Sequence, residues 1–257
     1  MRAKTRDLAH AIGSAAFAIL FLAATVPPAT AQQIDRSILE DPTRPEAERA
    51  QDEGRKPLRV YAWLGVEPGM TVADVFPGGG YNTHLLSRVV GPGGTVYGVL
   101  GFYEGLTFEE GAKPYDERYR ERVAEDGLDN VEIVSWVDEV PEGSIDVAVS
   151  VRSYHDVEWV MEDWKGRAEV VADLYRAMKP GGVVGIVESA TPRPGWDEET
   201  HRLNESVVIE DFTSAGFELA GESDMLANPD DDHTTSGFET GRHNTDRYLL
   251  KFRKPAE

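Results

Sequence analysis

The feature that most constrains the fold of this chain is an alternation of short apolar runs with segments of helical periodicity between residues 71 and 187. The apolar runs are rich in Val and are mainly apolar on both sides, so each is expected to be buried on both faces. Strands of this kind, separated by helices, form a parallel sheet through right-handed crossovers. The predicted strands are 71–76, 95–100, 131–136, 145–151 and 183–187, and the predicted helices are 57–64, 81–90, 114–126 and 170–178.

The pattern changes after residue 187. A predicted helix at 206–216 is followed by two predicted strands, 217–225 and 246–252, with no helix between them. A connection without a crossover helix joins antiparallel neighbours, so this pair is expected at one edge of the sheet. The sequence shows no internal repeat and no second core, and it predicts a single α/β domain over residues 57–257.

The first 31 residues differ from the rest of the chain. Basic residues precede an almost entirely apolar run at 11–26, and small residues follow up to Ala31. This order predicts a signal peptide that is cleaved after Ala31, and hence an exported protein, periplasmic or secreted. A retained membrane anchor is the alternative, but the apolar run is shorter than the roughly 18 to 20 residues that span a bilayer. Residues 32–56 are predicted as a polar lead-in with a short helix at 45–54.

The charge of the chain narrows its possible partners. Its 46 acidic residues against 26 Lys and Arg give a formal net charge of −20. Such a surface repels phosphate backbones and anionic lipid, so nucleic acid and, after signal cleavage, membranes are unfavourable partners. A small basic patch could still lie within the fold. The absence of cysteine excludes disulfides, thiolate nucleophiles and thiolate-bound metals.

The most informative segment is the end of the first predicted strand, where Asp74 precedes Pro77 and Gly78-Gly79-Gly80, and a helix begins at Tyr81. Ligands of open parallel sheets bind beyond the carboxyl ends of the strands, and glycines let the backbone approach them closely. The spacing matches neither the nicotinamide-binding G-x-G-x-x-G pattern nor the phosphate-binding G-x-x-x-x-G-K-[ST] pattern. The acid favours a cationic ligand, held directly or through water. A turn that only packs the helix on the strand is the alternative.

Five segments carry a family resemblance: Arg55-Lys56-Pro57, residues 68–81 (PGMTVADVFPGGGY), 174–182 (LYRAMKPGG), 227–229 (ANP) and 248–255 (YLLKFRKP). Together they resemble the class I S-adenosylmethionine-dependent methyltransferases, and within them a bacterial group of predicted methyltransferases that often carry export signals. The resemblance covers most of the chain after residue 31. It implies a Rossmann-like, seven-stranded sheet with S-adenosylmethionine over the first glycine turn.

The resemblance also implies which residues bind the cofactor. Asp74, Gly78 and Gly80 match the family's acid and glycine positions and would face the methionine part. Pro77, Gly79 and Tyr81 belong to the same turn. An acidic pocket agrees with a ligand that carries an ammonium and a sulfonium group.

Two positions depart from the family pattern. Val99-Leu100-Gly101 stands where an acid usually binds both ribose hydroxyls, and the nearest acid is Glu104. Trp136 stands near the position of an Asp that often meets the adenine amine, with Asp138 two residues later. Trp136 could stack on adenine and Asp138 could reach its exocyclic amine. The alternative is that Trp136 packs at the edge of the core and Asp138 is a solvated loop acid.

Candidates for catalysis are few. Methyl transfer needs in-line placement of the acceptor, and a base only where the acceptor must lose a proton. Ser153-Tyr154-His155-Asp156 follows the fourth predicted strand, where the acceptor is expected. His155 or Tyr154 could act as a base or line the pocket, and a His155 that caps the next helix is the alternative.

No metal site is predicted. Residues 230–232 (DDD) and His233 are interpreted as a solvated loop, because consecutive side chains cannot all point inward. His201 and His243 have no companions at ligand spacing. A hydrolase of the G-x-S-x-G type is excluded because that motif is absent.

The sequence therefore predicts an exported methyltransferase that uses S-adenosylmethionine and acts on a small-molecule acceptor. The alternative is an exported binding protein of the same fold, in which ribose recognition is degraded and no turnover occurs. Export favours this alternative, because S-adenosylmethionine is made inside cells.

Overall fold

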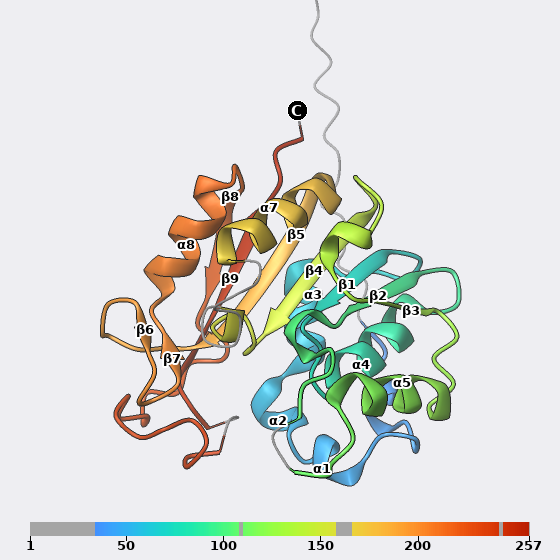
Figure 1. The fold of residues 1–257 in the computed structure, drawn as a ribbon, viewed down its shortest axis with the longest axis horizontal. Helices are drawn as coiled ribbons and strands as arrows, with labels where there is room; N and C mark the ends of the chain where they lie inside the picture. The colour runs from blue at the N-terminus through green and yellow to red at the C-terminus, as the bar shows by residue number, and fades with distance from the viewer. Residues whose placement is uncertain (1–33, 108–109, 158–165, 242–243, 257) are drawn as a thin grey trace, which may run out of the picture. The chain divides into compact units, whose positions relative to one another are not determined.

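The centre of the protein is one seven-stranded sheet with the strand order β3-β2-β1-β4-β5-β9-β8, which Figure 1 shows from right to left. The computed structural model describes residues 34–256 apart from 108–109, 158–165 and 242–243. Strands β1 to β5 are parallel, and β9 is antiparallel to β5 and β8. The predicted α/β fold with its terminal antiparallel pair is therefore confirmed. The strands are β1 (Thr71–Val75), β2 (Thr95–Val99), β3 (Val131–Val134), β4 (Ile145–Val151), β5 (Met178–Ser189), β8 (Glu218–Ser223) and β9 (Arg247–Arg253).

Helices cover both faces of this sheet (Figure 1). The α3 and α4 side chains join one cluster of buried residues, with α5 bonded to α4, and the α7 and α8 side chains join a second cluster. Each cluster takes alternate residues of the central strands, because successive side chains of a strand point to opposite faces. No helix in the described ranges combines the length and apolar character that a bilayer span requires. The helices are α3 (Pro57–Leu64), α4 (Tyr81–Val90), α5 (Tyr115–Glu125), α7 (Arg167–Ala177) and α8 (Glu205–Ser214).

The segment that precedes α3 packs against the start of α4. Arg44, which is buried, pairs with Asp52 at 2.6 Å, and the Tyr81 hydroxyl donates to the same carboxylate at 2.6 Å. These contacts place the segment beside the glycine turn that precedes α4. The single short helix predicted at 45–54 is divided into two four-residue helices. The elements are η1 (Arg36–Glu40), α1 (Glu46–Arg49) and α2 (Asp52–Arg55).

Two features of the second half of the chain differ from the prediction. Strand β5 begins at Met178, because Met178 pairs with Ile145 before a register shift brings Val183 opposite Val147. Residues 179–182, which separate the predicted helix 170–178 from the predicted strand 183–187, are thus an irregularity within a longer strand. A two-stranded hairpin, β6 (Trp196–Asp197) and β7 (Arg202–Leu203), was not predicted. Short 3₁₀ helices η2 (Gly101–Tyr103) and η3 (Val137–Glu139) follow β2 and β3.

The predicted signal peptide, residues 1–31, lies outside the described residues, and its cleavage stays a prediction. The predicted domain limits at 56 and 57 also stay predictions. His243 is likewise outside the described residues.

Candidate functional site

A cavity of about 190 Å³ lies at the carboxyl ends of β1 and β4, where the glycine turn leads into α4. Gly78 and Gly80 have φ angles of +54° and +85°, a conformation that glycine adopts without strain. The turn therefore brings backbone rather than side chains to the cavity wall. Four of the predicted cofactor-binding residues line the cavity: Pro77, Gly78, Gly79 and Tyr81.

The charged wall of this cavity is mostly positive. Arg55, Arg152 and Arg247 line it, and its one lining carboxylate, Glu48, is paired with Arg122. Burial, together with the positive charge of Arg55, lowers the pKa of Arg247 to about 10. A site with this charge suits an anionic group such as the carboxylate of an amino acid.

The three arginines come from three separate parts of the chain. Arg55 ends α2 and lies 4.3 Å above the ring of Tyr81. Arg152 follows β4 with a φ of +58°, and its Nε donates to Ser189 Oγ at 3.3 Å. Arg247 begins β9. Only Arg55 belongs to a segment that carries the family resemblance, so sequence reasoning missed the other two.

Asp74 does not line the cavity, and the predicted contact of its carboxylate with a cationic ligand, directly or through water, stays a prediction. The residue is 1% exposed, and its Oδ2 accepts a hydrogen bond of 2.6 Å from Thr83 Oγ1 of α4. The same hydroxyl lies 2.9 Å from the Tyr119 hydroxyl of α5. Burial raises the pKa of Asp74 to about 6. Asp74 therefore links the end of β1 to α4 and, through Thr83, to α5. These links hold the glycine turn between β1 and α4 in place.

The predicted ribose position, at the end of β2, is filled by an aromatic ring. Phe76 is 2% exposed and has a φ of +62°, and its ring lies against the backbone of Gly101, where an added Cβ would come within 2.1 Å of it. Phe102 is 4.8 Å from this ring, between centroids. The cavity is smaller than the roughly 300–1,000 Å³ of sites for drug-sized ligands.

The residues predicted to meet adenine lie near this ring but outside the cavity lining. Trp136 is half-buried and meets Phe76 edge-on, with the centroids 6.4 Å apart. Asp138 is exposed in η3. Gly80 is also absent from the lining and packs against Tyr119. The roles of Trp136 and Asp138 toward adenine stay predictions.

The structure separates the two catalytic candidates. The Tyr154 hydroxyl donates to Asp211 at 2.8 Å and the ring packs on Phe212, within the core beneath α8. His155 is buried, with its Nδ1 2.6 Å from Glu188 Oε2. Although burial alone would lower it, Glu188 and Asp156 raise the pKa of His155 to about 9. His155 is therefore protonated at neutral pH in this arrangement and cannot accept a proton.

His201 has companions that its position in the sequence did not reveal. The β6–β7 hairpin brings its Nε2 within 3.3 Å of Asp156 Oδ1, beside His155. The expectation that His201 stands alone is therefore wrong. The expectation of a solvated loop at 230–232 holds for Asp230 and Asp232, which are exposed. Asp231 instead pairs with the buried Arg202.

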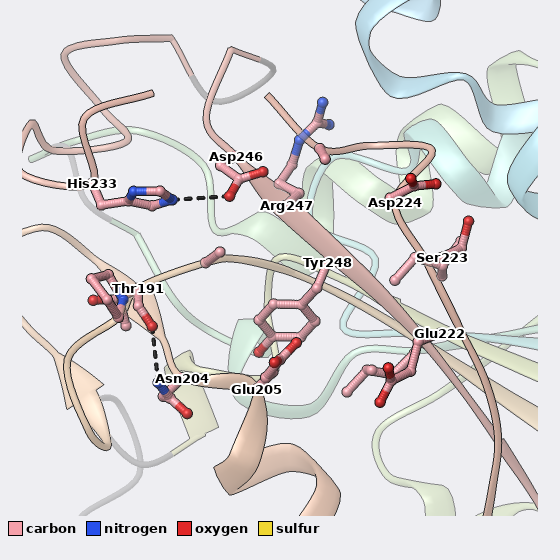
Figure 2. A pocket seen from close by; sticks show the side chains of 15 residues that line it. Thr191, Asn204, Glu205, Glu222, Ser223, Asp224, His233, Asp246, Arg247 and Tyr248 are labelled. Carbon is pink, nitrogen blue, oxygen red and sulfur yellow. Dashed lines mark hydrogen bonds and ion pairs between the residues drawn. The ribbon is translucent and has the colours of Figure 1, made fainter. Parts of the chain in front are cut away.

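A second, larger cavity of about 650 Å³ is lined by the ends of β5, β8 and β9 and by α8. Figure 2 shows acidic side chains around it, with the His233 ring pointing to Asp246 and Asn204 to Thr191. Its lining does not include the glycine turn. Arg247 lines both cavities. The volume and the acidic wall of this second cavity suit a larger, neutral or cationic molecule. The acids of this cavity are Glu205, Glu222, Asp224 and Asp246.

The curated relatives that this chain matches are methyltransferases. No family model matches the chain. It is 30% identical over 140 residues to an arsenite methyltransferase of Halobacterium salinarum, which covers 53% of this chain and 32% of that protein. It is 27% identical over 139 residues to a demethylmenaquinone methyltransferase of Listeria monocytogenes, which covers 52% of each. The chain thus spans between about a third and a half of the length of the curated relatives it matches.

Solved structures extend the likeness over most of the chain. An S-adenosylmethionine-dependent methyltransferase from Aquifex aeolicus superposes with a TM-score of 0.58 at 20% identity, over 85% of this chain and 98% of that one. A geranyl diphosphate C-methyltransferase from Streptomyces coelicolor, solved with S-adenosyl-L-homocysteine, gives 0.55 at 15% identity, over 86% and 85%. At these identities the likeness shows the fold alone. The chain has the fold of the class I S-adenosylmethionine-dependent methyltransferases, and the curated relatives it matches are methyltransferases.

Proposed function

We propose that this protein is an S-adenosylmethionine-dependent methyltransferase with a small-molecule acceptor. The observation that carries the proposal is the cavity at the glycine turn, in which bare backbone and three arginines converge at the carboxyl ends of β1 and β4. The names of the curated relatives and the shared fold support S-adenosylmethionine as the cofactor. Fold alone does not establish a reaction, so the site has to carry the argument.

The side chains and the backbone of the cavity have different roles in binding the cofactor. Arg55, Arg152 and Arg247 hold the carboxylate of the methionine end, and Gly78 and Gly79 let that end approach the backbone. S-adenosylmethionine supplies an activated methyl group, so the protein mainly has to place the acceptor in line with it. We expect the acceptor at the carboxyl end of β4, which residues 153–156 follow. Full seating of the adenosine end requires the Phe76 ring to turn away from Gly101.

Gly79→Val is expected to weaken S-adenosylmethionine binding at least about 100-fold while leaving the fold intact. Gly79 lines the cavity, and a Cβ added there meets no atom of the protein within 4 Å. Its φ is not in the left-handed region, so the backbone accepts a side chain. The valine would instead occupy space that the ligand needs, and about 2.7 kcal/mol of lost binding corresponds to that factor. Isothermal titration calorimetry with S-adenosylmethionine and S-adenosylhomocysteine measures it.

Gly93→Val is the matched control. Gly93 also lies in a turn, also lacks a left-handed φ, and also leaves open space for a Cβ, but it does not line this cavity. The Gly93→Val variant should bind S-adenosylmethionine and S-adenosylhomocysteine with the affinities of the wild type. Absence of wild-type binding at millimolar ligand, or equal affinities of the two variants, contradicts the proposed site.

We also propose that the protein is exported and begins at Gln32 after cleavage. The supporting observation is the order of basic, apolar and small residues before that position. Intact-mass spectrometry of protein from the extracytoplasmic fraction of an expressing bacterium is expected to give a chain without residues 1–31. A chain that retains its first residues and stays in the cytoplasmic fraction contradicts this proposal. An Ala31→Leu variant, with a large residue at the cleavage site, should accumulate uncleaved.

A further inference from the structure

A buried cluster of two histidines and a carboxylate lies beyond the carboxyl ends of β4 and β5, outside both cavities. His155 and Asp156 follow β4, and His201 lies in the turn between β6 and β7. Each offers one ligand atom, and the three atoms lie within 4.8 Å of one another. The sequence gives no hint of this set, because 45 residues separate the two histidines.

The separations of the donor atoms fit a metal ion. His155 Nε2 lies 3.2 Å and His201 Nε2 lies 3.3 Å from Asp156 Oδ1. Two ligands bonded at about 2.1 Å with a tetrahedral angle lie about 3.4 Å apart. Among the described residues His155 Nε2 makes no aligned hydrogen bond, although it is buried. A buried nitrogen of this kind, with a second histidine nitrogen and a carboxylate oxygen within 4.8 Å, points to a ligand.

The surroundings orient the first histidine as they do in metal sites. Glu188 Oε2, which is completely buried, lies 2.6 Å from His155 Nδ1, so His155 Nε2 is the ring nitrogen left to bind a metal ion, which would displace its proton. Trp196 stacks on His155 with the ring planes 12° apart. The carboxylates of Glu188 and Asp156 lie beside the two imidazoles, and their negative charge favours a divalent cation at this place.

We propose that His155 Nε2, Asp156 and His201 Nε2 bind one divalent transition-metal ion of the zinc class, with Glu188 as the residue that orients His155. Two imidazoles and one carboxylate are a ligand set that zinc and its neighbours prefer over calcium or magnesium. The inference does not depend on the cofactor cavity, since no residue of the set lines it.

The test is a zinc titration of untagged protein that has been freed of metal with a chelator. We expect one zinc ion per chain with a Kd in the micromolar range or tighter, read by competition with a chromophoric zinc indicator. Co²⁺ as a probe should give a visible absorption spectrum unlike that of the aqueous ion, and zinc should remove it. His201→Ala and Asp156→Asn should each weaken zinc binding at least tenfold, and Glu188→Gln by about 10- to 100-fold.

His233→Ala is the matched control, because His233 forms the same kind of contact with a carboxylate, 2.9 Å from Asp246, without a second histidine beside it. It should bind zinc as the wild type does. Circular dichroism checks that each variant is folded. Should the His201 and Asp156 variants not fold, the wild-type cobalt spectrum decides: a spectrum that matches aqueous Co²⁺ overturns the proposal. Two further results overturn the proposal. One is a zinc affinity of the wild type that is no better than that of folded His201→Ala. The other is a loss of zinc affinity in His233→Ala that equals the loss in His201→Ala.

Discussion

Arg202→Ala is expected to lower the free energy of unfolding by about 3–5 kcal/mol. The Arg202 side chain is fully buried and pairs with Asp231 through two bonds of 2.7 and 2.9 Å. It also donates to the carbonyl oxygens of Ala190 and Thr235 at 3.1 and 3.0 Å. Truncation leaves the carboxylate of Asp231 and both carbonyl groups buried without the guanidinium that donates to them. Removing one partner of a buried ion pair typically lowers the free energy of unfolding by about 3–5 kcal/mol.

Arg193→Ala is the control, because Arg193 also pairs with an aspartate, Asp197, at 3.1 Å, but is half exposed. Solvent screens such a pair, so its loss should cost about 0–1 kcal/mol. Urea unfolding followed by circular dichroism measures both variants. A loss in Arg202→Ala no larger than that in Arg193→Ala would show that the buried network contributes little.

The size of the Arg202 effect matters for the proposed metal site. Arg202 lies in β7, next to His201, and anchors β7 to the loop that carries Asp231. Because the hairpin is only two residues long on each side, its own backbone bonds cannot hold His201 in place. The side-chain network around Arg202 supplies the missing rigidity. Burial of Arg202 therefore contributes to the position of His201, together with the rings of Trp196 and Phe238 that pack against it.

The sheet could be predicted because its sequence signals are local. The runs of β1, β2 and β4 are apolar on both faces, and glycine or proline marks the turns between them. The hairpin β6–β7 was not predicted because two-residue strands have no periodicity to detect. The start of β5 was missed because residues 179–182 contain Pro and two Gly, which indicate a turn, whereas pairing with β4 tolerates them as an irregularity.

The site was harder to predict than the fold. The glycine turn is continuous in sequence, so its backbone role could be foreseen. Arg152 and Arg247 reach the cavity only because β4 and β9 end and begin beside it, and nothing in their local sequence marks them. The direction of the Asp74 side chain could not be predicted for a different reason: a strand-end acid can face the ligand or the following helix, and Thr83 of α4 donates a hydrogen bond to it. Side-chain direction at a strand end is decided by such tertiary partners.

Asp74→Asn is expected to stabilise the protein at neutral pH by up to about 3 kcal/mol. Burial raises the pKa of Asp74 from 3.8 to about 6, and a rise of about two units corresponds to about 3 kcal/mol. The folded state keeps the proton up to about pH 6, whereas the unfolded chain loses it near 3.8. The free energy of unfolding of the wild type should therefore fall as the pH rises between these values. The amide of the Asn variant has no charge to bury, and its oxygen still accepts from Thr83.

Urea unfolding of both proteins between pH 4 and pH 7.5 measures this difference. The two free energies of unfolding should nearly coincide at pH 4 and diverge as the pH rises to about 7, with the variant the more stable. Asp129→Asn, which changes an exposed aspartate, should follow the wild-type profile. A variant that is less stable than the wild type at pH 7 would mean that the ionised Asp74 has a favourable partner at the turn. That result would contradict the unfavourable burial of the ionised carboxylate on which this prediction rests.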